Sequence, residues 1–130
     1  MQIRLRFPIK GTYYYSAQSA REIGIIQVEA QLNLIKEPEN EHDPFAIQIW
    51  LSKQLLGYVP RQLAYDFRHW SQKELEQFNC ALVFQHPHRL ESRLMLPWPS
   101  LNWRQKILFF WRSLWLIWHR HAYWRSKPLQ

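Results

Sequence analysis

Three successive tyrosines, Tyr13, Tyr14 and Tyr15, are the densest group of side chains in this sequence that could bind a planar ligand. Aromatic rings stack on nucleobases with roughly 1–3 kcal/mol per base, whatever the base. In a strand, Tyr13 and Tyr15 would share one face and Tyr14 the other. Tyrosine also favours strands as a half-buried residue. The run alone therefore leaves a stacking platform and a structural role both open.

The stretch "EPENEHDPFAIQIW", residues 37–50, places four carboxylates and two prolines before an apolar run. An ionised Asp43 is a hydrogen-bond acceptor, so it can bind a hydroxyl group and would repel a phosphate. Such a site would discriminate a free hydroxyl end from an internal phosphodiester. The alternative for Asn40 and Asp43 is an Asx turn that shapes the loop, which explains Asn40 at least as well, and one residue can serve both roles. The three glutamates of the stretch are expected to form solvated loop surface.

Arg61 follows Pro60 in "LLGYVPRQLA". Proline fits the first turn of a helix, where backbone N–H groups and the helix dipole favour an anion. A phosphate there would meet the guanidinium as well. The alternative is an exposed arginine that pairs with Asp66 or with a loop glutamate.

The sequence contains little that indicates a catalytic or metal-binding site. His86 and His88 flank a proline, and His119 and His121 are two residues apart, so neither pair has the i, i+4 spacing of a helical metal site. No nucleophile elbow, P-loop or distinctive carboxylate pair occurs. We expect a protein that is not an enzyme and uses no metal or cofactor.

The elements that must position these residues are mostly strands. Ile3, Leu5 and Phe7 alternate with polar residues, as in a strand with one buried face. The longest such alternation covers residues 26–34. Further strands are predicted in "DPFAIQIW" and "KQLLGYV", which form a hairpin, and in "CALVFQ" and "RLESRLML".

Two short helices are predicted between these strands. Pro60 opens the first, with Leu63 and Phe67 among its apolar positions at helical spacing, and Ser71 with Glu74 forms a capping box for the second. Short strands with late helices favour a small β-barrel or a half-open sheet with helices attached, an α+β domain.

The sequence resembles the HIRAN domain over roughly residues 3–95. The resemblance rests on Gly11 and the tyrosine run, on Gly24, and on two motifs with matching spacing, "EPENEHDPFAIQI" and "LLGYVPRQLA". It implies an OB-like or SH3-like β-barrel of about six strands that binds single-stranded DNA or captures a free 3′-hydroxyl end.

The resemblance also implies which residues bind DNA. These are Tyr13, Tyr14, Tyr15, Asn40, Asp43, Tyr58, Arg61 and, placed only loosely on a late strand, Phe84. Tyr13 stands where a well-studied member has an arginine, and Tyr58 where it has a histidine. The lost arginine removes a phosphate contact.

The C-terminal segment carries the whole net positive charge of the chain. Residues 1–91 contain ten Lys+Arg and ten Asp+Glu, whereas residues 92–130 contain seven Lys+Arg and no acid. Five of the eight tryptophans lie among these charges, unlike in disordered solvating tails: Trp103, Trp111, Trp115, Trp118 and Trp124. Such a segment is expected to meet phosphates of nucleic acid or of lipid head groups.

Within that segment, residues 103–125 predict a helix with one narrow polar stripe. Two columns repeat every seven positions: Gln105, Arg112, His119 and Lys106, Ser113, Arg120. Apolar runs are far shorter than the roughly 20 residues that span a bilayer. This helix could pack on its own domain, self-associate, lie on a membrane surface, dock on a protein or stack on DNA.

We therefore expect residues 1–96 to form the barrel domain and residues 97–130 a basic, Trp-rich helical extension, with Pro97 and Pro99 at the boundary. The expected function is non-catalytic DNA binding in repair or replication-fork processing, with a repair helicase or nuclease as partner. The alternative is a membrane-associated or protein-docking adaptor acting through the helix. A single cysteine and no recognisable signal peptide predict a reducing, cytoplasmic location.

Overall fold

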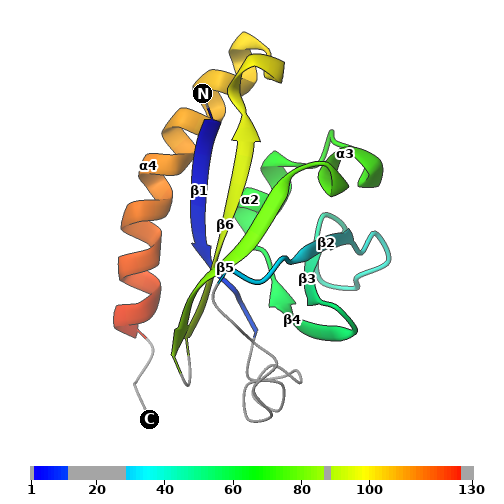
Figure 1. Cartoon of the computed structure of the whole chain (residues 1–130), viewed down its shortest axis with the longest axis vertical. Helices are drawn as coiled ribbons and strands as arrows, with labels where there is room; N and C mark the ends of the chain where they lie inside the picture. The colour runs from blue at the N-terminus through cyan, green and yellow to red at the C-terminus, as the bar shows by residue number, and fades with distance from the viewer. Residues whose placement is uncertain (1, 12–28, 87–88, 127–130) are drawn as a thin grey trace.

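The computed structural model describes residues 2–11, 29–86 and 89–126, and these form two three-stranded antiparallel sheets with helices around them (Figure 1). One sheet has the order β1-β6-β5 and the other β2-β3-β4. The strands are β1 (Gln2–Pro8), β2 (Asn33–Lys36), β3 (Ile47–Leu51), β4 (Gln54–Tyr58), β5 (Asn79–His86) and β6 (Arg89–Pro97). The helices are α2 (Arg61–Asp66), α3 (Gln72–Glu76), the 3₁₀ helix η2 (Trp98–Ser100) and α4 (Trp103–Ser126). The predicted α+β class with six strands is confirmed.

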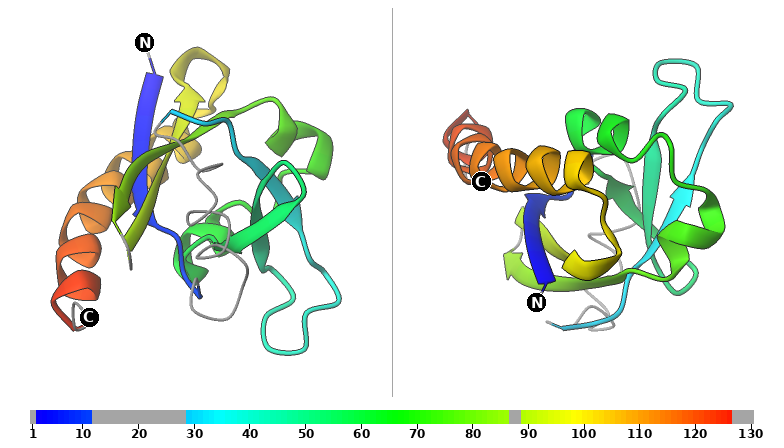
Figure 2. Two further views of the ribbon diagram at one scale, coloured as in Figure 1. Left: turned by 60° about the horizontal axis from the view of Figure 1, so that its bottom comes forward. Right: turned by 90° about the horizontal axis from the view of Figure 1, so that it is seen from above.

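The two sheets do not close into a complete barrel; among the described residues, isolated bridges join them at two junctions. Lys10 pairs with Tyr58 at one junction and Gln31 with Ala81 at the other. Glu29, just before the second junction, takes a positive φ of 69°, so the chain turns there and only residues 33–36 pair regularly with β3. The half-open sheet that the sequence also allowed is nearer to the observed arrangement, seen from two sides in Figure 2.

The predicted strands agree with the observed ones to different degrees. Ile3 is half-buried, Leu5 and Phe7 are fully buried, and the β3–β4 hairpin forms as expected. The alternation over residues 26–34 holds for Leu32 and Leu34, which are buried, while the residues before 29 lie outside the described part of the chain. The third predicted strand begins at Ile47 rather than at residue 43, because residues 43–46 are used by a turn.

Both short helices begin where the sequence indicated. Pro60 is the N-cap of α2, and Leu63 and Phe67 are buried. Ser71 accepts a hydrogen bond from the backbone of Glu74, whose carboxylate accepts from the Ser71 backbone, so the capping box of α3 is confirmed.

Gly57 permits the close approach at the first junction between the sheets. A Cβ atom at this position would lie 2.3 Å from the carbonyl oxygen of Lys10. Lys10 and Tyr58 exchange backbone hydrogen bonds of 2.9 and 2.8 Å at the same place. The glycine of "LLGYVP" is therefore required for packing, and it fixes the backbone of Tyr58 against the end of β1.

Helix α4 packs on the domain through a narrow row of residues and runs alongside β1 (Figure 1). Phe109 and Leu116 are each 1% exposed and belong to the common core. The ring of Phe109 stacks on Trp70 with a centroid distance of 5.3 Å and lies 5.6 Å from Phe67. Packing of the extension on its own domain, one of the alternatives, is thus what the structure shows.

The polar stripe of α4 faces the domain rather than solvent. The Arg112 Nε atom lies 2.5 Å from Asp66, and Arg120 lies 3.3 Å from Glu91. The carboxylates of Asp66 and Glu91 are 5% and 4% exposed, and Glu91 also accepts from Arg6 at 2.6 Å. Most of the apolar surface of the helix is consequently left outside.

The single cysteine, Cys80, lies on β5 and is buried. Burial raises the pKa of its thiol to about 12. The thiol therefore behaves as a small apolar core group.

Replacing Phe109 by alanine should reveal how much stability the docked helix provides. We expect a loss of about 3–5 kcal/mol in the free energy of unfolding, the usual result when a buried aromatic side chain leaves a cavity. The neighbouring Phe110→Ala change is a matched control, because Phe110 is 51% exposed. Urea unfolding should place this control within about 0.5 kcal/mol of the wild type. Equal, small losses for both variants would contradict the observed docking.

Candidate nucleic-acid interface

The loop between β2 and β3, residues 37–46, is shaped by two Asx turns. The Asn40 Oδ1 atom accepts hydrogen bonds of 2.9 Å from the backbone N–H groups of His42 and Asp43. The Asp43 Oδ1 atom accepts one of 2.9 Å from the backbone of Phe45. The Asx turns are therefore present at both Asn40 and Asp43, and the turn at Asp43 uses only one of the two carboxylate oxygens.

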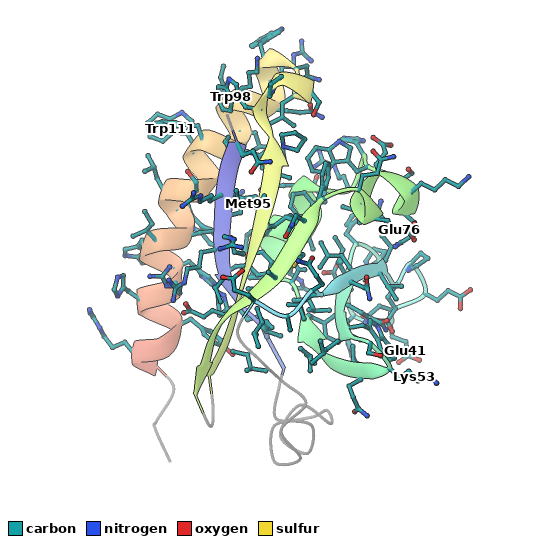
Figure 3. The ribbon with its side chains drawn as sticks, viewed as in Figure 1. Glu41, Lys53, Glu76, Met95, Trp98 and Trp111 are labelled. Atoms are coloured by element: carbon teal, nitrogen blue, oxygen red, sulfur yellow. The ribbon has the colours of Figure 1, made fainter. Side chains whose placement is uncertain are left out.

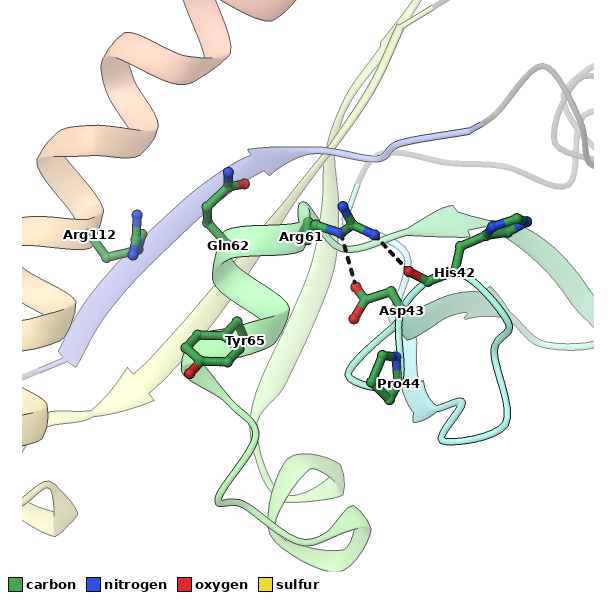
Figure 4. A pocket seen from close by; sticks show the side chains of 7 residues that line it. All are labelled: His42, Asp43, Pro44, Arg61, Gln62, Tyr65 and Arg112. Carbon is green, nitrogen blue, oxygen red and sulfur yellow. Dashed lines mark hydrogen bonds and ion pairs between the residues drawn. The ribbon is translucent and has the colours of Figure 1, made fainter.

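The second carboxylate oxygen of Asp43 faces Arg61 (Figure 4). The Asp43 Oδ2 atom lies 3.6 Å from the Arg61 Nε atom, and the Arg61 Nη2 atom donates a 2.8 Å hydrogen bond to the carbonyl of His42. The Arg61 side chain is 67% exposed and that of Asp43 is 17% exposed. The alternative interpretation of Arg61, an exposed arginine paired with an acid, holds, but the partner is Asp43 rather than Asp66 or a glutamate, since Asp66 pairs with Arg112.

Glu37 joins the loop to Tyr58. The Tyr58 hydroxyl donates a 2.6 Å hydrogen bond to the Glu37 carboxylate, and the Asn40 side-chain amide donates one of 3.2 Å to the same oxygen. The hydrogen bond from Tyr58 is the main cause that lowers the pKa of Glu37 below its usual 4.5. Glu37 is thus not merely solvated surface, as the sequence suggested, whereas Glu39 and Glu41 are exposed as expected.

A groove of about 370 Å³ lies between this loop, α2 and α4, and we call it the Arg61 groove (Figure 4). Its lining combines two guanidinium groups, one carboxylate and one phenol ring. The lining residues are His42, Asp43, Pro44, Arg61, Gln62, Tyr65 and Arg112. Charged and aromatic groups of this kind suit a ligand that carries phosphate and a planar base.

Exposed aromatic rings border the groove, and sequence reasoning missed them. Tyr65 is 47% exposed and Phe45 is 41% exposed, and their rings meet edge to face at 5.3 Å. The guanidinium of Arg68 lies 3.9 Å above the Tyr65 ring. Phe45 belongs to the "DPFAIQI" motif, which is the one signal that could have indicated it; Tyr65 and Arg68 are joined to it only by the fold.

The structure brings together only part of the predicted site. Asp43 and Arg61 share the groove, and Asn40 shapes the loop beside it. Tyr58 connects through Glu37 and does not line the groove. Its backbone partner Lys10 leads into the tyrosine run.

Four predicted residues are not tested by these contacts. Tyr13, Tyr14 and Tyr15 lie outside the described residues. Phe84 lies on β5 opposite Glu91, directly after a register shift, and its side chain is not among those described.

The described parts of the chain also bear on metals and membranes. Among residues 2–11, 29–86 and 89–126, no three histidine, cysteine or acidic side chains gather in a way that could hold a metal ion. Within the same ranges, no helix is both long and apolar enough to cross a bilayer.

Comparison with known proteins gives one family and two related structures. The family model described as HIRAN domain matches residues 3–97. The crystal structure of the HIRAN domain of human HLTF superposes with a TM-score of 0.59 at 18% identity, covering 73% of this chain and 78% of that chain. A crystal structure of a protein from Lactobacillus plantarum gives a TM-score of 0.55 at 17% identity, covering 75% of this chain and 98% of that chain. No curated protein matches the chain significantly.

The bond between Tyr58 and Glu37 predicts an acid-sensitive contribution to stability. Because the pKa of Glu37 is lowered in the folded state, this contribution is present above pH 4.5 and is lost as the pH falls through the lowered pKa. Tyr58→Phe should cost about 1 kcal/mol near pH 7 and less at pH 3, measured by urea unfolding. Tyr65→Phe is the control, since Tyr65 is 47% exposed. A cost that does not change with pH would contradict the bond.

Proposed function

Because this chain belongs to the HIRAN domain family, whose model covers residues 3–97, we propose that it binds single-stranded DNA or free 3′-hydroxyl ends in the Arg61 groove. The HIRAN domain is a DNA-binding module. The observation that carries the assignment to this groove is the pair formed by Arg61 and Asp43. A cation for phosphate and an acceptor for hydroxyl stand side by side there.

Arg61 is the proposed phosphate contact. A guanidinium has five N–H donors in a planar fork, and the side chain is 67% exposed. It can therefore keep its bond to the His42 carbonyl and still bind a phosphate oxygen. The bond to His42 also holds the side chain against the loop, which reduces the rotamer entropy lost on binding.

Asp43 is the proposed reader of the strand end. A carboxylate oxygen has two lone pairs, so Oδ1 can retain the Phe45 backbone bond while Oδ2, at 3.6 Å from Arg61, accepts a hydroxyl. A terminal phosphate would place like charges together. Asp43 also partly neutralises Arg61, so it lowers affinity for any backbone phosphate while favouring a hydroxyl end.

Bases would stack on the aromatic border of the groove. The Tyr65 ring, backed by the Arg68 guanidinium at 3.9 Å, offers a polarised face that every base can use. Tyr13, Tyr14 and Tyr15 are proposed to add to this platform. Recognition of this type does not depend on base sequence, which suits a module that meets any strand end.

The proposed module is not catalytic and acts by placing repair or replication-fork enzymes of other chains on DNA. Tyr58 has a structural part in this proposal, because its hydroxyl holds Glu37 and so fixes the base of the loop. The resemblance implied a direct DNA contact for Tyr58, and the proposal gives it this supporting role instead. Arg61 would then be the principal phosphate contact among the described residues.

Discrimination between strand ends tests the role of Asp43. We expect the wild type to bind an oligonucleotide with a 3′-hydroxyl about tenfold more tightly than one with a 3′-phosphate, because a hydrogen bond to a charged group contributes about 1.5–3 kcal/mol. Asp43→Asn should abolish that preference, since asparagine keeps the Asx turn and removes the charge. Fluorescence anisotropy with both oligonucleotides measures the ratio.

Glu41→Gln is the matched control for this experiment. It removes one negative charge from an exposed position in the same loop, two residues from Asp43. The end preference should survive in this variant. Equal binding of both ends by the wild type would exclude end reading and leave general single-strand binding open.

The salt dependence of binding tests Arg61. Arg61→Gln should weaken binding to every sequence and reduce the slope of log K against log salt by about 0.7, the value for one phosphate contact to a single strand. Lys53→Gln, in the exposed turn of the β3–β4 hairpin, removes the same charge away from the groove and should leave the slope unchanged. Identical slopes for wild type and Arg61→Gln would place the DNA elsewhere.

A further inference from the structure

The outward face of α4 is a continuous apolar surface. Trp103, Trp111 and Trp118 are 66%, 64% and 66% exposed, and Trp111 points away from the sheets in Figure 3. Other exposed apolar side chains lie between them on the same side of the helix. They are Ile107, Phe110, Leu114 and Ile117. We call these seven residues the tryptophan face; over 16 residues it extends about 24 Å along the helix.

The orientation of the helix is fixed, so this exposure is a stable feature of the fold. The side opposite the tryptophan face carries Phe109 and Leu116 into the core and pairs Arg112 with Asp66. Rotating the helix to bury the tryptophans would pull the arginine away from a carboxylate that is 5% exposed. Leaving that charge buried and unpaired costs several kcal/mol.

The charges around the tryptophan face have one sign. Arg104 lies at its N-terminal end, and Arg125, with His121, continues the same side of the helix beyond Trp118. Residues 92–130 contain no aspartate or glutamate. An anionic surface would therefore meet cations at both ends of the apolar strip and no opposing carboxylate from this segment.

From this combination we infer that the tryptophan face lies on the surface of an anionic lipid bilayer, with α4 parallel to the membrane plane. Tryptophan prefers the level of the lipid head groups, where its ring is apolar and its N–H can bond. A helix in this position buries its apolar face about 5–10 Å into the head-group and acyl boundary. The domain, packed on the opposite side of the helix, would remain in water.

A second copy of the chain fits the same surface less well. A symmetric dimer brings one patch against itself. The tryptophan face would then offer its copy cations and no carboxylate, whereas an anionic lipid surface supplies the missing charge. This inference is independent of the DNA-binding proposal, because the Arg61 groove uses none of the seven residues.

The test is flotation of the full chain, without DNA, with vesicles of phosphatidylcholine alone or mixed with phosphatidylglycerol. We expect binding to the mixed vesicles, at least about tenfold weaker binding to phosphatidylcholine alone, and weakening by salt. The double variant Trp111→Ser/Trp118→Ser should lose at least about tenfold in partitioning. Both residues are exposed, and circular dichroism checks that the fold is kept.

Ile35→Ser is the matched control, because Ile35 is a 40% exposed apolar residue on β2 rather than on α4. This variant should bind vesicles like the wild type. Absence of wild-type binding to the anionic vesicles, or equal binding by the double variant, would overturn the inference. So would a dimer, detected by light scattering, that the double variant converts to monomer, since a second copy would then cover the face.

Discussion

Two buried carboxylates govern how this small domain is assembled. Asp66 is the last residue of α2 and Glu91 lies on β6, and the side chain of each is nearly excluded from water. A buried carboxylate is costly unless it is paired and hydrogen-bonded. Arg112 and Arg120, both on α4, supply the partners. The two ion pairs, two helical turns apart, set the rotation of α4 and explain why its polar stripe faces inward.

Hydrogen bonds from polar side chains also determine the shape of the loop between β2 and β3. Asn40 and Asp43 accept hydrogen bonds from backbone N–H groups of this irregular segment and so fix its shape. Yet one oxygen of Asp43 is aimed at Arg61 on a different element. A side chain that builds the loop is therefore also the group that we propose to contact a strand end, so removing it would alter loop geometry and the proposed recognition together.

Local patterns predicted local structure well here. The alternation at Ile3, Leu5 and Phe7 and the capping box at Ser71 depend on neighbours within a few residues, so the sequence contains the whole signal. Glu29 shows the limit, because its positive φ interrupts an alternation that continues in the sequence. The candidate site residues that the sequence did not indicate have another cause: Phe45 and Tyr65 meet across 20 positions, and nothing local marks that pair. The inward stripe of α4 likewise depends on carboxylates elsewhere in the chain.

The burial of Cys80 has a practical consequence for studying this molecule. It is the only cysteine of the chain. It lies on β5 with its side chain buried, and this burial raises the pKa of the thiol to about 12. At neutral pH it is protonated and shielded from alkylating reagents. A cysteine introduced at the surface would therefore be the thiol that a maleimide dye or a spin label modifies, without any need to remove the native one. Distances and mobilities could then be recorded at chosen points of the intact chain.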